Sequence, residues 1–239
     1  MRTKNKNDIV VIGTGRFGSA VIEQLIKLEK NILVIDKNEE DVRPYVDEVQ
    51  KAVVADAADM KALKAIRIDQ FETVVVAVSD NIEIVAALLE LNVKNIIARA
   101  KSERHARVLK QIGVNVIIRP EYESGTRAAL IAANNNFINY TEKLYELEPN
   151  FVIGTTKLKN DDLIGKPIRD LKLTDRGITI VLIKRNNVPQ MVTANGKLEM
   201  DDTVTIFGHV SDVTVALQWF NEVHEPDETQ ESQEASKEA

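Results

Sequence analysis

The sequence predicts an α/β fold, in which a Rossmann-like, doubly wound parallel sheet is followed by a linking helix and a small α+β domain. Three observations support this fold class. As far as Pro120, short runs of β-branched and aliphatic residues alternate with stretches of helical periodicity. A glycine-rich turn follows the first run, and the alternation stops after Pro120. The 239 residues suffice for one ordinary domain and a second, smaller one.

The N-terminal part is expected to form six parallel strands joined by helices. Continuous aliphatic runs are typical of strands that helices cover on both faces. The strands are expected at residues 9–13, 31–36, 51–56, 73–79, 95–100 and 115–120. The helices between them are expected at residues 18–30, 39–49, 59–68, 81–92 and 102–113. Each helix carries apolar residues three or four positions apart, and the connections have the length that parallel strands require.

The pattern after Pro120 indicates a different architecture. Residues 124–145 are expected to form one long helix, rich in small residues along one side. Strands are expected near 151–158, 178–184, 188–193 and 203–208, and a last helix over 211–223. The domains are therefore expected at 1–123 (nucleotide binding), 124–149 (linking helix) and 150–223 (small α+β), before an acidic tail at 224–239. Because that tail lacks apolar periodicity, disorder is expected there.

Composition argues against several classes of function. The formal net charge is −6, from 31 Lys and Arg against 37 Asp and Glu, and no broad nucleic-acid-binding face is expected. The polar start differs from a signal peptide, and no apolar run approaches the length that spans a bilayer. A cytoplasmic protein is therefore expected. With no cysteine and only 3 histidines, disulfides and a zinc enzyme are not expected.

The glycine-rich turn has the spacing of a phosphate-binding loop. The motif GTGRFG occupies residues 13–18, between the first expected strand and the first expected helix, which is the context that gives this motif its meaning. Gly13 permits the tight turn, Gly15 lets the backbone approach a pyrophosphate, and Gly18 lets the helix pack closely on the strand. The free N–H groups and the helix dipole are then expected to bind the anion.

Asp36 completes this fingerprint at the end of the second strand. A carboxylate there accepts hydrogen bonds from both ribose hydroxyls and repels a 2′-phosphate. The ligand is therefore expected to be ATP, ADP, NAD(H) or another adenosine compound, in preference to NADP. The alternative is that the glycines only form a tight turn, which Asp36 caps. Asp56, after the third strand, is expected either near the adenine edge or as a turn residue.

Two charged residues indicate phosphate and metal binding. Arg16 favours a triphosphate, because it places a cation over the phosphates. Glu121, just past the sixth strand, could complete a phosphate-bound Mg²⁺ or Ca²⁺ site, or be a solvated loop acid. The candidate ligands in this domain are Gly13, Thr14, Gly15, Arg16, Phe17, Gly18, Asp36, Lys37, Asp56, Ala57, Arg99 and Glu121.

No residue is evidently in place for chemistry on a substrate. A dehydrogenase needs an acid–base group at the nicotinamide. His105 is expected on a helix surface, and His209 as a cap or turn residue. Tyr122 and Tyr140 lack the lysine of a Tyr-x-x-x-Lys motif. We therefore expect a sensor and not an enzyme, in which bound nucleotide is read out as conformation or assembly. The alternatives are an NAD(H)-dependent oxidoreductase or redox sensor, and a scaffold that binds no nucleotide.

Longer segments resemble the cytosolic RCK-type (regulator of conductance of K⁺) regulatory subunits of bacterial Ktr and Trk potassium uptake systems. In the N-terminal half the resemblance lies in VIGTGRFGSAV, LVIDKNEE, VVADAAD, VVVAVSDN, IIARA and IGVNVIIRPE. In the C-terminal half it lies in LIGKPIRDLKL, GITIVLIKR and LEMDDTVTIFGHVSDV. The glycine motif alone is shared with many dehydrogenases, so the combination with this second half carries the specificity.

The resemblance implies a nucleotide-gated regulator of potassium uptake. It implies a homo-oligomer, typically an octameric ring, that docks beneath a membrane-embedded potassium channel at the inner face of the membrane. ATP and ADP would give the ring different shapes. Arg16 would reach a phosphate, on its own or a neighbouring subunit's ligand, and Glu121 would serve a cation site between subunits.

The resemblance also implies a role for the small C-terminal domain. In this family it dimerises, and in many relatives it binds cyclic di-AMP at the dimer interface. The segment that matches this site contains Ile164, Ile168, Arg169 and Asp170. The alternative is a packed turn with a surface arginine. One departure concerns a turn, where Asp201-Asp202 replaces the Gly-Asp that is usual in the family.

Overall fold

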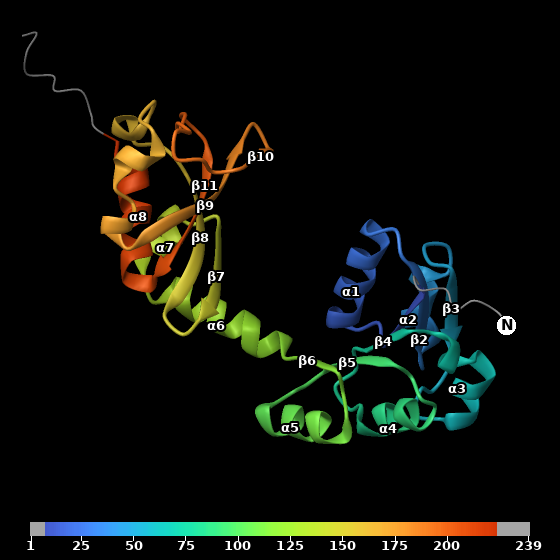
Figure 1. Cartoon of the computed structure of the whole chain (residues 1–239). Coiled ribbons are helices and arrows are strands. Elements are labelled where there is room, and N and C mark those ends of the chain that lie inside the picture. The colour runs from blue at the N-terminus through green and yellow to red at the C-terminus, as the bar shows by residue number, and fades with distance from the viewer. Residues whose placement is uncertain (1–7, 224–239) are drawn as a thin grey trace, which may run out of the picture. The chain divides into compact units, whose positions relative to one another are not determined.

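The computed structural model describes residues 8–223, which divide into two compact units at residues 123 and 124. In the first unit all strand pairs are parallel, and the strand order is β3-β2-β1-β4-β5-β6 (Figure 1). The strands are β1 (Asp8–Ile12), β2 (Asn31–Asp36), β3 (Lys51–Val54), β4 (Thr73–Val76), β5 (Asn95–Arg99) and β6 (Val116–Ile118). The predicted doubly wound sheet is therefore confirmed.

Helices cover both faces of this sheet. They are α1 (Arg16–Lys27), α2 (Glu39–Val42), α3 (Met60–Ile66), α4 (Ile82–Glu90) and α5 (Glu103–Ile112), with short 3₁₀ turns at Arg43–Tyr45 and Ile68–Gln70. Because side chains alternate along a strand, Val10 and Ile12 pack with α3, α4 and α5, while Val11 packs against α1 on the opposite face. The expected helix over 39–49 is wrong beyond Val42, because Pro44 has no N–H to donate to the helix and the chain tightens into a 3₁₀ turn.

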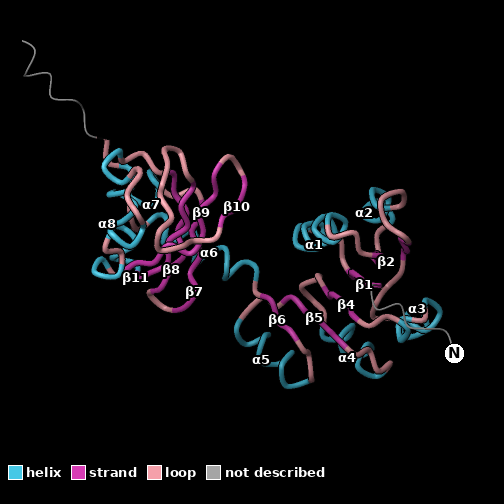
Figure 2. Tube along the Cα trace, turned by 45° about the horizontal axis from the view of Figure 1, so that its top comes forward, coloured by secondary structure: helices cyan, strands magenta, loops and turns pink. Residues whose placement is uncertain are grey.

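The second unit is an antiparallel sheet with helices on one face. The strand order is β10-β9-β11-β8-β7. The strands are β7 (Lys143–Glu148), β8 (Phe151–Lys157), β9 (Ile178–Arg185), β10 (Val188–Gln190) and β11 (Thr203–His209). The helices are α6 (Pro120–Ala132), whose first four residues belong to the first unit, α7 (Asn135–Tyr140) and α8 (Val210–Asn221). Short 3₁₀ turns lie at Asp161–Leu163, Ile168–Leu171 and Thr174–Arg176. Figure 2 shows α7 and α8 beside the strands of this unit.

The core of this unit lies between one sheet face and α7 and α8. Val152 and Ile206 contribute from β8 and β11, and Phe137, Leu217 and Phe220 contribute from the two helices. All five are at most 1% exposed. At Gly154 an added Cβ would lie 3.3 Å from the Val213 side chain, which shows how closely α8 approaches β8. The predicted small α+β architecture is confirmed.

The single helix expected over 124–145 is wrong. The chain leaves the helix at Asn134, which is extended (φ −147°, ψ 119°) and whose side chain accepts a 2.9 Å hydrogen bond from the N–H of Asn136. Asparagine offers the backbone such a local partner outside a helix, and so favours a new helix start. Residues 143–148 then form the unpredicted strand β7, which pairs with β8 across a turn where Asn150 has φ +67°.

Two further expectations concern the ends of the chain and the membrane. The predicted disordered tail at 224–239 lies outside the described residues. Within residues 8–223, no helix combines the length and the apolar character that a membrane span needs.

Candidate nucleotide-binding site

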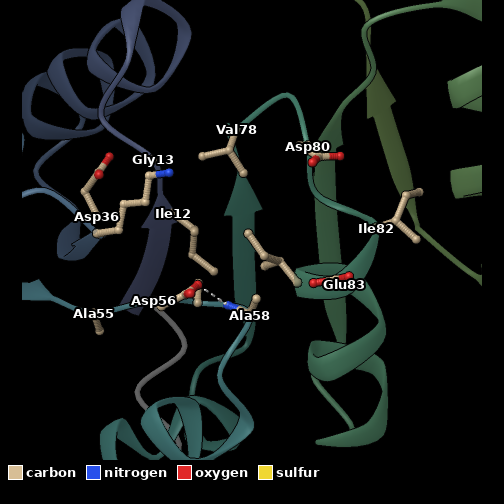
Figure 3. Close-up of a pocket in the computed structure, with 13 residues that line it drawn as sticks. Ile12, Gly13, Asp36, Ala55, Asp56, Ala58, Val78, Asp80, Ile82 and Glu83 are labelled. Carbon is tan, nitrogen blue, oxygen red and sulfur yellow. Dashed lines mark hydrogen bonds between the residues drawn. The ribbon is translucent and has the colours of Figure 1, made fainter.

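A cavity of about 580 Å³ opens at the carboxyl ends of the parallel strands of the first unit. It lies at the point where the strand order reverses between β1 and β4, which is where open α/β sheets bind ligands. In Figure 3, Gly13 and Asp36 lie on one side of the cavity, and Asp80 and Glu83 on the other. The lining residues are Ile12, Gly13, Asp36, Lys37, Ala55, Asp56, Ala57, Ala58, Val78, Asp80, Ile82, Glu83 and Ile84.

Two glycines of the loop are required by the fold itself. Gly13 has φ +95°, and an added Cβ would lie 2.5 Å from the Val78 side chain. At Gly18 an added Cβ would lie 1.9 Å from the carbonyl oxygen of Gly13. No side chain can stand at that distance, so α1 can start this close to β1 only with glycine there.

The third glycine of the motif differs from the other two. Gly15 has an ordinary φ of −64°, and an added Cβ would meet no protein atom within 4 Å. It is the N-cap of α1, where no side chain caps the helix and no acidic residue lies in the first turn. The first N–H groups of the helix are therefore free of side-chain partners, and the space above them suits an anion. The chain thus fits a nucleotide pyrophosphate at this position.

Asp36 is tied to the glycine loop. Its Oδ2 accepts hydrogen bonds from the N–H and the hydroxyl of Thr14 at 2.8 and 2.9 Å, and its Oδ1 accepts one from the N–H of Asn38 at 3.1 Å. Burial raises the pKa of Asp36, but the hydrogen bonds from Thr14 and Asn38 outweigh it and leave the pKa below its ordinary value. Asp36 is therefore an ionised acceptor at neutral pH, as ribose binding requires.

Asp56 lies on the β3 side of the cavity. Its Oδ1 accepts a 2.9 Å hydrogen bond from the N–H of Ala58, so it forms the turn that the sequence allowed as an alternative. The same side chain lines the cavity, together with Lys37 and the buried Ala57. Asp56 therefore forms a turn, and this turn also holds its carboxylate at the wall of the cavity, where a ligand could reach it.

Of the loop residues, only Gly13 lines the cavity, while Thr14, Gly15 and Gly18 lie outside its lining. The remaining predicted residues of this domain also lie outside it. Arg16 is exposed and Phe17 is half-buried, both in the first turn of α1. Arg99 donates a hydrogen bond from Nη2 to Glu121 in an ion pair. The pKa of Glu121 is lowered by its own backbone N–H and by Arg99, and also by the charge of Arg16. The charges of Arg99 and Arg16 therefore both act on the carboxylate of Glu121.

Sequence reasoning missed the β4 side of the cavity. Val78 and Asp80 follow β4, and Ile82 and Glu83 begin α4. The signal was available, since the segment after the strand across the reversal point faces any ligand bound there. The fully buried Asn81 fixes this segment, because its side-chain amide donates to the carbonyls of Val78 and Arg99 at 2.9 and 2.8 Å.

The structure also places His105 and His209, the two histidines within the described residues. The expectation that His105 lies on a helix surface is wrong, because it is 8% exposed and its Nδ1 accepts a hydrogen bond from the N–H of Lys101. Burial and the charge of Lys101 lower the pKa of His105, and Asp80 opposes them. His209 is the N-cap of α8, as expected of a cap residue, and accepts from the N–H of Ser211.

The predicted C-terminal residues lie along one short segment. Ile168 is 8% exposed in the core of the second unit, and Ile164 is half-buried. Arg169 is exposed and donates from Nη1 to the side chain of Asn195 at 2.6 Å, and its Nε lies 3.5 Å from a carboxylate oxygen of Asp170. In this single chain the arginine and the aspartate are accessible, and Ile168 is covered.

The fold and the site define a class of protein, in which a Rossmann-type nucleotide-binding domain is joined to a small α+β domain. Residues 9–120 match the TrkA-N domain, and residues 156–221 match the TrkA-C domain. The chain is 31% identical over 217 residues to the Ktr system potassium uptake protein A of Bacillus subtilis, covering 89% of this chain and 96% of the relative. It therefore belongs to the RCK-type family of the Ktr potassium uptake proteins.

A second relative agrees with this family, and two solved structures share the fold. The Ktr system potassium uptake protein C of Bacillus subtilis is 30% identical over 214 residues, which cover 87% of this chain and 95% of the relative. The RCK domain of GsuK matches with a TM-score of 0.60 at 17% identity, over 95% of this chain and 50% of that one. The GsuK channel bound to NAD also matches with a TM-score of 0.60, over 42% of its chain. At this identity the two structures support the fold alone.

Proposed function

We propose that this chain is the nucleotide-gated regulatory subunit of a potassium transporter. In this proposal ATP or ADP binds in the first unit, with the pyrophosphate at Gly15 and the ribose at Asp36. The observation that carries the proposal is the open space above Gly15 at an uncapped helix N-terminus, in a chain whose relatives are potassium uptake proteins. The two nucleotides would stabilise different shapes of an assembly and so bias a membrane-embedded partner, because coupling requires a difference in binding free energy between states.

The assembly and the partner extend this proposal. We propose a homo-oligomeric ring, of eight subunits by the family resemblance, that associates with a potassium channel subunit at the inner face of the membrane. Arg16 would contact a phosphate, and Glu121 would contribute to a Mg²⁺ or Ca²⁺ site. The mass of the particle by light scattering, with and without ATP, tests the ring. A monomer under both conditions would contradict it.

NAD(H) is the second candidate ligand. It is favoured by the carboxylate of Asp36, which suits an adenosine ribose in NAD as well as in ATP, and by a solved channel of the same fold that is bound to NAD. A thermal-melt titration with ATP, ADP, NAD⁺ and NADH separates the candidates. A ligand at 100 times its Kd stabilises the folded state by about 2.7 kcal/mol. If none of these nucleotides raises the melting temperature, the regulator proposal is wrong.

Asp36→Ala is expected to weaken every adenosine ligand about tenfold or more. The substitution removes an ionised acceptor, and a hydrogen bond to a charged group contributes about 1.5–3 kcal/mol. The dissociation constants of ATP, ADP and NADH, measured by calorimetry, provide the test. Asp69→Ala is the matched control, because it removes an exposed carboxylate of the same unit that does not line the cavity. Unchanged affinity in Asp36→Ala would place the nucleotide elsewhere.

The C-terminal unit is proposed to bind cyclic di-AMP through the segment of Arg169. Arg169→Ala is expected to remove the thermal shift caused by cyclic di-AMP. It is expected to leave the shift caused by ATP unchanged, since Arg169 lies in the second unit, whose core is separate from that of the nucleotide-binding unit. Lys159→Ala is the control, because it removes an exposed cation elsewhere in the same unit. A full cyclic di-AMP shift in Arg169→Ala would show that this arginine does not contact the ligand.

A further inference from the structure

The carboxylate of Asp36 has few free acceptor positions. A carboxylate offers about four lone-pair positions, two on each oxygen. The N–H and the hydroxyl of Thr14 take two of them on Oδ2, at 2.8 and 2.9 Å, and the N–H of Asn38 takes one on Oδ1, at 3.1 Å. A ribose that is bound through both of its hydroxyls needs two positions. One of the present donors must therefore leave, or Asp36 holds a single ribose hydroxyl.

The N–H of Lys37 also lowers the pKa of Asp36 as a hydrogen-bond donor. Among all these donors, only the Thr14 hydroxyl turns about a rotatable bond. The backbone at Thr14 is fixed, because the preceding Gly13 donates to the carbonyl of Ile35 at 2.8 Å and the Thr14 carbonyl accepts from Ser19 Oγ at 2.7 Å. Tyr45 donates to that serine oxygen at 2.8 Å, which ties the loop to the segment after α2. The Thr14 side chain is itself held, since the residue is 8% exposed and β-branched, which restricts its χ1 rotation.

We propose that the Thr14 hydroxyl is a specificity determinant of the nucleotide site, which occupies the acceptor position on Asp36 that a second ribose hydroxyl would take. Asp36 then binds only one of the two ribose hydroxyls. A nucleotide that lacks the hydroxyl not bound by Asp36 should therefore bind almost as tightly as the complete ribonucleotide. This inference rests on the proposed nucleotide binding at Asp36. It assigns Thr14 a role that the glycine motif does not require, because the residue between the first two glycines of that motif is unspecified.

The experiment compares ATP with 2′-deoxy-ATP and 3′-deoxy-ATP by calorimetry. In the wild-type protein, one analogue is expected to bind within about twofold of ATP and the other roughly tenfold more weakly, because one hydroxyl bond to a charged acceptor is lost. In Thr14→Val, the position on Oδ2 is open to the ligand while the shape of the side chain is kept. Both analogues are then expected to bind roughly tenfold more weakly than ATP.

One control isolates the hydroxyl. Thr14→Ser keeps it and is expected to show the wild-type pattern. If both analogues bind equally weakly to the wild-type protein, or if Thr14→Val keeps the wild-type ratios, the inference is wrong while nucleotide binding stands. If ATP itself does not bind to the wild-type protein, both the proposed function and the inference that rests on it are wrong. If Thr14→Val does not fold, Thr14→Ala takes its place, because it removes the same hydroxyl and is expected to show the same ratios, and the wild-type comparison can overturn the inference on its own.

Discussion

Gly15→Ala is expected to leave the ligand-free protein folded and to weaken ATP and ADP binding at least tenfold. The added Cβ meets no protein atom within 4 Å, and the φ of −64° suits alanine. The change in the free energy of unfolding should stay within about 1 kcal/mol, because a poorer N-cap is offset by the lower entropy of the unfolded chain. In the proposed binding mode the Cβ would stand where the pyrophosphate approaches the helix N–H groups, so binding would lose those contacts.

Gly18→Ala is the matched control for this prediction. Its Cβ would lie 1.9 Å from the backbone oxygen of Gly13, so α1 would have to move away from β1. Overpacking of this kind costs roughly 3 kcal/mol, and the melting temperature should fall even without ligand. Melting curves and ATP titrations of both variants provide the measurement. If Gly15→Ala binds ATP as the wild-type protein does, the anion does not lie over this helix end.

The first unit could be predicted from the sequence because its signals are local. The central strands are runs of aliphatic residues that are buried on both sheet faces, such as residues 32–35, and each strand is separated from the next by a helical stretch. The loop residues are spaced so that Gly13 and Asp36 must meet at one sheet edge. The opposite wall of the cavity, with Asp80 and Glu83, carried no motif of its own, and only the strand order places it there.

The second unit shows where local signals fail. Residues 135–140 are helical as expected, but they form a separate helix, α7. The preceding helix α6 ends before Asn134, because the Asn134 side chain provides a hydrogen-bond partner for the start of α7. Residues 143–148 become a strand because β8 offers them a pairing edge, which is a tertiary effect. His105 was misplaced for a related reason. Its neighbours in the sequence are charged, while its burial comes from the packing of α5 on the sheet.

Carboxylates surround the cavity and bear on its ligand. Asp36, Asp56, Asp80 and Glu83 line it, and Lys37 is the one cation among the lining residues of the described chain. A further phosphate on the adenosine half, as in NADP, would be repelled by several negative charges and not by Asp36 alone. In the proposed binding mode the pyrophosphate would avoid this repulsion, because it would lie over the start of α1, where the helix dipole is positive.

Asp202→Ala is expected to destabilise the second unit by about 3 kcal/mol, because it leaves Arg185 without its buried partner. Asp202 is 1% exposed, and it accepts from Nε and Nη2 of Arg185 at 2.9 and 2.8 Å and from the N–H of Glu199 at 2.9 Å. The Asp201 that precedes it has φ +63°, which shows that this turn departs from regular structure. Urea unfolding followed by the fluorescence of Trp219 measures the change, since the chain's 1 tryptophan lies in this unit.

Glu199→Gln is the contrasting variant, because Glu199 binds the same arginine from a side chain that is 61% exposed. Its loss should cost less than about 1 kcal/mol, since water screens the pair.

The pH dependence of stability tests the ion pair of Asp202 separately. Burial raises the pKa of Asp202, but Arg185 and the Glu199 N–H outweigh it and leave the pKa below its ordinary value. A folded-state pKa that is lowered in this way adds stability above about pH 4, and the stability is lost as the pH falls through the folded-state pKa. The urea midpoint of the wild-type protein should therefore fall more steeply with decreasing pH than that of Asp202→Ala. If the two midpoints fall in parallel, the ionised carboxylate of Asp202 does not stabilise this turn.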